Sequence, residues 1–78
     1  MYQFFESIKV KDGLPLNLEW HQQRVDRTFR HFYKDAVSHE LTELLTVPEA
    51  FQSGVVKARF LYDAHAFELE FSQYKPKE

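Results

Sequence analysis

The sequence contains no cysteine, only two glycines and three prolines, and no long run of apolar residues. Without cysteine it has neither a disulfide framework nor a thiolate metal site, which fits a cytoplasmic protein. No apolar stretch approaches the roughly 20 residues that a membrane-spanning helix needs. The N-terminus also lacks the basic-then-apolar layout of a signal peptide. We therefore expect a cytoplasmic protein with no membrane partner.

An excess of positive charge is also missing, because ten Lys and Arg are set against twelve Asp and Glu, for a net charge of −2. Nucleic-acid binding would need a cationic face, so we expect no nucleic-acid partner. The histidines at positions 31, 39 and 65 have no spacing that would gather a metal ion with carboxylates. We therefore expect no metal site.

Aromatic residues are abundant, at 17% of the chain with eight Phe, and apolar residues make up 44%. A chain of 78 residues has room for one domain, and this apolar content is sufficient for a packed core. Disorder is therefore excluded. The aromatic content exceeds what so small a domain hides easily, so we expect some rings to face a partner.

The first regular pattern alternates with a period of two and predicts a strand over residues 2–11. Asp12 and Gly13 then predict a hairpin turn, because glycine takes a positive φ without strain. Residues 14–16 return as a short strand, and Pro15 places it at a sheet edge. The two faces of the first strand are Tyr2, Phe4, Glu6, Ile8 and Val10 on one side, and Gln3, Phe5, Ser7, Lys9 and Lys11 on the other.

The longest helical pattern runs from Asn17 to Lys34. Asn17 suits the N-cap, because its side-chain oxygen can accept a hydrogen bond from a free backbone N–H of the first turn. Cationic side chains fall toward the other end, where the helix dipole favours them. We expect one stripe of this helix to pack against a sheet: Leu18, His21, Val25, Phe29 and Phe32.

The second half of the chain predicts two more helical segments and two strands. Ser38 is a candidate cap for a helix that buries three leucines. Pro48 suits the first position of a short helical turn that ends by Gly54. Strands are expected over 55–62 and 66–74, joined by a turn at 63–65, with a linker at 75–78.

This order of elements, ββ-ααα-ββ, predicts an α+β fold. We expect a four-stranded antiparallel sheet with the helices packed on one face.

His21 and Arg24 stand out within the long helix. They are three residues apart and share a helix face next to the apolar stripe. An arginine at such a position needs an anionic partner, because burying its charge unpaired is costly. Two interpretations remain open. Arg24 either pairs with a nearby carboxylate or reaches solvent, with His21 as a hydrogen-bonded core histidine, or it holds a ligand anion.

An ordered set of motifs extends from the first strand into this helix: Phe5-Glu6-Ser7-Ile8, Asp12-Gly13, Leu16-Asn17-Leu18-Glu19 and His21-Gln22-Gln23-Arg24-Val25. The set resembles the N-terminal motif of class IV aminotransferases, the pyridoxal-phosphate enzymes of fold type IV. That family includes branched-chain and D-amino acid aminotransferases and aminodeoxychorismate lyases. The H-x-x-R motif alone is weak evidence, and the ordered set is much stronger.

The resemblance implies roles for particular residues. Arg24 matches the arginine that holds the cofactor phosphate, a task suited to a planar guanidinium. Phe5, Ser7 and Lys9 match strand positions that line the cofactor and substrate cleft. Some relatives carry arginine in place of Lys9, so carboxylate recognition there is expected to differ.

The resemblance also implies that a basic residue of the third long strand, Arg59 or Lys57, meets a substrate carboxylate. The alternative is a surface pair of Arg59 with Glu68 or Glu70 on the neighbouring strand.

The resemblance covers the N-terminal, smaller domain of such an enzyme. The C-terminal domain, which supplies the lysine that carries pyridoxal phosphate, has no match here, and no lysine of the chain has a similar context. We therefore expect a truncated or N-terminal part of the enzyme that needs the C-terminal domain as a partner. Alone, it should not transaminate and should bind the cofactor weakly or not at all.

A second interpretation is a stand-alone interaction module, such as a homodimer, that kept the fold without the chemistry. A third, a small enzyme built around His21, lacks a second catalytic group. Ser7 has no visible activating base, so we assign no catalytic residue.

Overall fold

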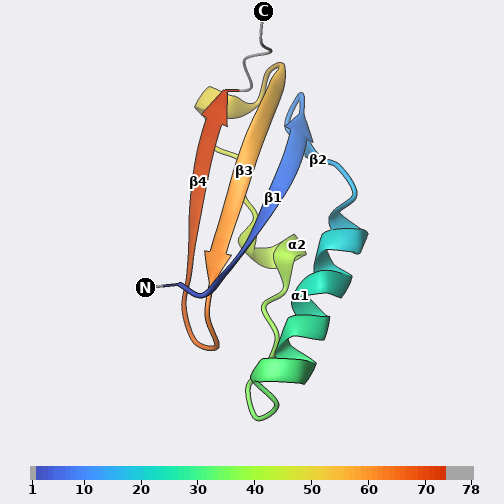
Figure 1. Ribbon diagram of the computed structural model, residues 1–78. Coiled ribbons are helices and arrows are strands. Elements are labelled where there is room, and N and C mark those ends of the chain that lie inside the picture. The colour runs from blue at the N-terminus through green and yellow to red at the C-terminus, as the bar shows by residue number, and fades with distance from the viewer. Residues whose placement is uncertain (1, 74–78) are drawn as a thin grey trace, which may run out of the picture.

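The computed structural model describes residues 2–73. Two β-hairpins, one before and one after the helical middle segment, join into one sheet, and the helices lie beside it (Figure 1). None of the helices in this part of the chain is long and apolar enough to cross a membrane. The elements in chain order are β1 (Phe4–Lys11), β2 (Leu14–Pro15), α1 (Leu18–Phe32), α2 (Leu41–Leu44), the 3₁₀ helix η1 (Glu49–Phe51), β3 (Val55–Tyr62) and β4 (Phe67–Gln73).

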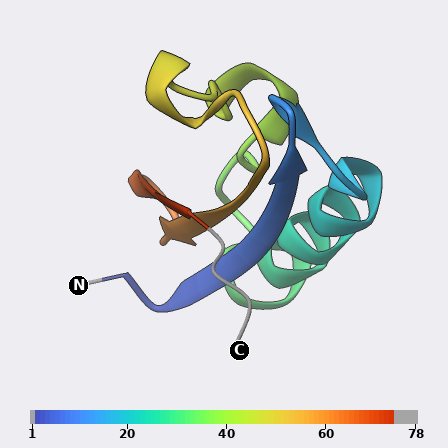
Figure 2. The same ribbon diagram turned by 90° about the horizontal axis from the view of Figure 1, so that it is seen from above.

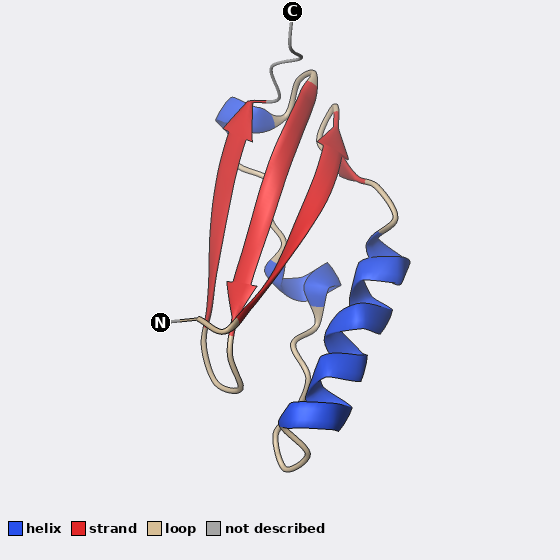
Figure 3. Cartoon of the chain, viewed as in Figure 1, coloured by secondary structure: helices blue, strands red, loops and turns tan. Residues whose placement is uncertain are grey.

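The four strands form one antiparallel sheet in the order β2-β1-β3-β4. β1 pairs with β3 along its whole length, from Phe4 opposite Tyr62 to Lys11 opposite Val55. The helices lie on one side of this sheet (Figure 3), with α1 next to β1 and η1 next to β4. The view from above shows the same arrangement of α1 beside β1 (Figure 2). The predicted α+β fold is confirmed.

The core lies between the inner face of the sheet and the helices. The alternation predicted for β1 and β3 is confirmed, because every second residue of each strand is buried. At the centre, the Phe60 ring is fully buried and stacks on Tyr62, with ring centroids 5.2 Å apart. The buried apolar residues are Ile8, Val10, Val25, Phe29, Leu41, Leu45, Val56, Ala58, Phe60 and Tyr62.

The turn between β1 and β2 has the predicted chemistry. Asp12 and Gly13 both have positive φ, 49° and 83°, which is the conformation that suits a two-residue hairpin loop. The turn is also tied to the start of β3, since the backbone N–H of Gly54 donates to Asp12 Oδ1 at 2.8 Å. The short β2 lies at the sheet edge, as Pro15 predicted.

Asn17 occupies the N-cap position of α1 as predicted, but its expected capping hydrogen bond is absent, and the predicted cap at Ser38 is wrong. Asn17 precedes α1 but has a left-handed backbone, with φ 56° and ψ 31°, and its side chain makes no capping hydrogen bond. An N-cap side chain needs an extended backbone to reach the first turn. Ser38 does not cap α2, which begins only at Leu41; its hydroxyl instead donates to Asp26 Oδ1 at 2.6 Å. Pro48 lies just before η1, not at its first position.

Several helices and strands are shorter than predicted. α1 ends at Phe32 instead of Lys34, β1 begins at Phe4, and β4 begins at Phe67. Phe32 was expected in the buried stripe but is 59% exposed. It packs against Phe4, the first residue of β1, so little sheet remains there to cover it. The predicted strand end at residue 74 and the linker at 75–78 lie outside the described residues.

Asp63 organises the turn between β3 and β4. Its Oδ1 accepts hydrogen bonds from the backbone N–H groups of His65 and Ala66, each at 2.9 Å. These hydrogen bonds lower the pKa of the Asp63 carboxyl below its ordinary value of 3.8, because they stabilise the charged form.

We expect the stability advantage of the wild type over Asp63→Ala to depend on pH. The group's folded-state pKa is depressed, so its contribution is fully present above pH 3.8 and is lost as the pH falls through the lower folded-state value. Urea unfolding of both proteins at several pH values down to about pH 2 measures this difference. A difference that stays constant over the acidic range would contradict the prediction.

Candidate functional site

A buried carboxylate marks the junction between β1 and α1. Because the side chains of β1 alternate, Glu6 points to the inner face of the sheet, in line with Ile8 and Val10. Its side chain is only 5% exposed. A charge in such a place is costly unless it is paired and hydrogen-bonded, so the partners of Glu6 decide what the site can do.

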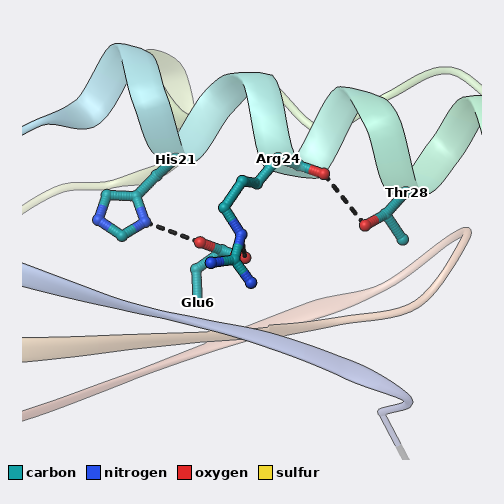
Figure 4. Close-up of polar contacts among 4 residues, drawn as sticks. All are labelled: Glu6, His21, Arg24 and Thr28. Atoms are coloured by element: carbon teal, nitrogen blue, oxygen red, sulfur yellow. Dashed lines mark hydrogen bonds and ion pairs between the residues drawn. The ribbon is translucent and has the colours of Figure 1, made fainter.

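Both carboxylate oxygens of Glu6 are engaged by α1 (Figure 4). His21 Nδ1 donates to Oε1 at 2.7 Å, and Arg24 Nε lies 3.3 Å from Oε2. The two α1 residues reach one carboxylate because they are three apart and project from the same helix face. The nearby Tyr62 phenol has its pKa raised by burial, and the Glu6 charge acts in the same direction.

Arg24 is held between the sheet and solvent. Its side chain is 51% exposed, and its guanidinium carbon lies 5.0 Å from the centre of the Trp20 ring, a cation–π contact. The Thr28 hydroxyl donates to the backbone oxygen of Arg24 at 3.0 Å. The guanidinium borders a shallow hollow of about 320 Å³, which is lined by Trp20, Gln23, Arg24, Arg27 and Thr28.

This hollow has the chemistry of an anion site. The ion pair with Glu6 uses Arg24 Nε. Among residues 2–73, Glu6 is the only carboxylate within 4.0 Å of the Arg24 guanidinium. The Arg24 side chain lines the hollow and is half exposed, so its guanidinium can supply hydrogen-bond donors there, and Arg27 adds a second positive charge. An anion with several oxygens, such as a phosphate, matches these donors.

The other predicted site residues lie together on the outer face of the sheet. Phe5 is 55% exposed, and the Arg59 guanidinium lies 4.9 Å from the centre of its ring. Ser7 is directly opposite Arg59 in the strand register, and Lys9 is opposite Lys57. A shallow hollow of about 270 Å³ follows this part of β1 and β3, with Ser7, Lys9 and Lys57 among its lining residues.

The structure therefore divides the predicted site into two groups. Arg24 reaches the inner face of β1 through Glu6, whereas Phe5, Ser7, Lys9 and Arg59 are on the outer face. The surface pair considered for Arg59 is present at the limit of an ion pair, since Arg59 Nη1 lies 4.0 Å from Glu70 Oε1. Within residues 2–73, no group of three or more His, Asp or Glu side chains is placed to hold a metal ion.

Sequence reasoning missed Glu6 as the partner of Arg24. The available signal was a carboxylate on the apolar face of a strand that precedes a helix with His and Arg on its own inner face. It also missed the contact of Trp20 with Arg24. The signal was their spacing of four residues, which places both side chains on one helix face. The alternative interpretation of His21, as a hydrogen-bonded core histidine, agrees with the structure.

No protein-family model matches this sequence. A protein from Haemophilus influenzae Rd described only as uncharacterized is 30% identical over 79 residues, which is 99% of this chain but 42% of that protein. A crystal structure from Haemophilus somnus 129pt, named as a candidate 4-amino-4-deoxychorismate lyase, superposes on the whole chain with a TM-score of 0.82 and 26% identity.

The match to the crystal structure covers 44% of that chain. This chain thus spans less than half the length of both relatives. The likeness extends over all the elements described above, so the fold of this chain is that of one part of the larger, lyase-named protein.

Proposed function

We propose that this chain is the N-terminal domain of a class IV aminotransferase-like protein that depends on pyridoxal phosphate. In it, Arg24 holds the cofactor phosphate, and Phe5, Ser7, Lys9 and Arg59 form a wall of the substrate pocket. The observation that carries the proposal is the full-length superposition on a protein named as a candidate 4-amino-4-deoxychorismate lyase.

The residues at the Arg24 hollow fit the phosphate group of this cofactor. A phosphate monoester carries about two negative charges, and two cationic side chains, Arg24 and Arg27, line the hollow. The fit is limited to the phosphate end. No lysine of residues 2–73 lines this hollow, and we propose that the group that carries the cofactor belongs to the rest of a larger protein.

When bound, pyridoxal phosphate supplies an electron sink for bond cleavage at an amino-bearing carbon. The residues of this chain bind and orient. Arg24 fixes the phosphate end through charge-assisted hydrogen bonds, while Lys9 and Arg59 offer positive charge to an anionic substrate group. Phe5 supplies apolar contact area to the same wall.

A chimera tests this proposal. We would replace the matching segment of the Haemophilus somnus protein with residues 1–73 of this chain and titrate pyridoxal phosphate, following visible absorbance and fluorescence. The chimera should bind the cofactor. Arg24→Gln should weaken binding by about 10- to 100-fold, because it removes charge-assisted hydrogen bonds to a phosphate.

Arg30→Gln is the matched control, because Arg30 is an exposed arginine of the same helix that does not border the Arg24 hollow. It should bind within about twofold of the unsubstituted chimera. If Arg24→Gln and Arg30→Gln bind the cofactor equally well, the role of Arg24 is wrong. If the unmodified Haemophilus somnus protein binds and the folded chimera does not, the assignment of the domain is wrong.

A further inference from the structure

We propose that Glu6 is a positioning residue that holds the Arg24 guanidinium in the orientation needed to receive an anion. This inference rests on the proposed function for its biological purpose. The geometry that supports it is independent of that function, because it is a property of the chain itself. Glu6 contacts the guanidinium and not the ligand, so its role is to act through Arg24.

Stability alone is a poor reason for this ion pair. The free-energy cost of removing a carboxylate and its partners from water usually cancels the gain from pairing them. Apolar residues of similar size at the same positions often give equal stability. The neighbours of Glu6 on the inner face, Ile8 and Val10, are fully buried and apolar. A leucine at position 6 would continue this face, so the carboxylate has to be explained by what it contacts.

The contact uses one particular nitrogen of Arg24. Glu6 Oε2 lies 3.3 Å from Nε, and Arg24, whose side chain is half exposed, also lines the hollow. A carboxylate that paired with the terminal nitrogens would block the donors that an incoming anion needs. An ion pair made through Nε restricts the rotation of the side chain and, in this proposal, leaves the terminal nitrogens to the anion.

Glu6 is itself fixed by a hydrogen bond from His21 Nδ1 to its other oxygen at 2.7 Å. The Trp20 ring covers the Arg24 guanidinium at 5.0 Å. Arginine has a large rotamer entropy, and restricting it before the ligand arrives lowers the entropy lost on binding. The contacts that link His21 to Glu6 and Glu6 to Arg24 thus preorganise one guanidinium.

Nuclear magnetic resonance of the 78-residue chain tests this directly. The Nε–Hε signal of Arg24, identified by its loss in Arg24→Lys, reports the order of the side chain and its exchange with water. In the wild type we expect an ordered, slowly exchanging Hε with a nuclear Overhauser contact to the Glu6 side chain. In Glu6→Gln we expect faster exchange, a lower heteronuclear Overhauser value, and inorganic phosphate binding weakened by about tenfold.

Glu19→Gln is the matched control, because Glu19 is an exposed glutamate on α1 and is not paired with Arg24 among the described residues. It should leave the Arg24 signal unchanged. Glu6→Asp keeps the charge and should restore part of the order. A folded Glu6→Gln protein with an unchanged Arg24 signal would overturn the inference. If Glu6→Gln does not fold, the test is the nuclear Overhauser contact between Arg24 Hε and Glu6 in the wild type. The absence of that contact would overturn the inference.

The two proposals fail in distinguishable ways. If the Arg24 signal depends on Glu6 but phosphate leaves it unshifted in the wild type, the positioning by Glu6 stands and the phosphate role of Arg24 fails. If phosphate shifts the Arg24 signal equally in wild type and Glu6→Gln, Arg24 binds the anion without help and the positioning role fails.

Discussion

Phe60→Ala is expected to lower the free energy of unfolding by about 3–5 kcal/mol. The Phe60 side chain is fully buried and stacks on Tyr62 and Phe67, with His39 edge-on to its ring. Its loss leaves a cavity at the centre of the sheet that these rings cannot fill by small shifts. A domain of this size has a total stability on the order of 5–15 kcal/mol, so the change would leave it close to unfolding.

Urea unfolding followed by circular dichroism measures this effect. Phe5→Ala is the matched control, because the same truncation is made on the outer face, where the ring is 55% exposed. It should cost less than about 1 kcal/mol. Equal losses for the two variants would show that the core is not centred where the structure places it.

His21→Leu is expected to destabilise the protein by about 3 kcal/mol, because the buried Glu6 carboxylate loses its hydrogen bond from His21 and keeps a charge. The double variant Glu6→Leu/His21→Leu removes both polar groups at once. It should recover most of the loss, because apolar side chains then meet across the β1–α1 junction.

The double-mutant cycle therefore has a coupling energy of at least about 2 kcal/mol. Urea unfolding of the wild type, the two single variants and the double variant supplies the four values. Additive losses would show that Glu6 and His21 do not depend on one another. The double variant also separates stability from positioning, because it should be well folded and yet have a disordered Arg24 side chain.

Most of the fold could be predicted from local patterns. Alternation in β1 and β3 identifies the buried residues because one face of each strand meets the core and the other meets solvent. Asp12-Gly13 predicted the hairpin because few residues tolerate positive φ at both positions. These features depend on residues that are close together in the sequence, so the sequence alone is enough to predict them.

The errors came from contacts between distant segments. Ser38 was expected to cap a helix, but Asp26 on α1 lies close enough to accept a hydrogen bond from its hydroxyl. The first turn of α2 is instead satisfied by Gln22, whose side-chain oxygen accepts from the Leu41 N–H at 2.7 Å. Cap residues offer polar groups that several partners can use, so tertiary packing decides which partner is chosen.

The candidate site was predicted in part for the same reason. Arg24 was identified from its motif, and the need for an anionic partner followed from its position beside the apolar stripe. That the partner is Glu6 depends on how α1 lies over β1, which no local pattern specifies. The roles of Arg24, Phe5, Ser7, Lys9 and Arg59 toward a cofactor or substrate remain predictions.

The pairing of β1 with β3 has a consequence for biosynthesis. β1 is made before the other elements of residues 2–73, yet its one long partner among them begins at Val55, and the pairing of Phe4 with Tyr62 closes a loop over most of the described residues. At roughly 5–20 residues per second, the ribosome needs several seconds to deliver β3 after β1 has emerged. During that interval the apolar faces of β1 and α1 have no sheet to cover them. The nascent chain is then open to chaperones, and the β3–β4 hairpin is the element whose arrival ends the exposure.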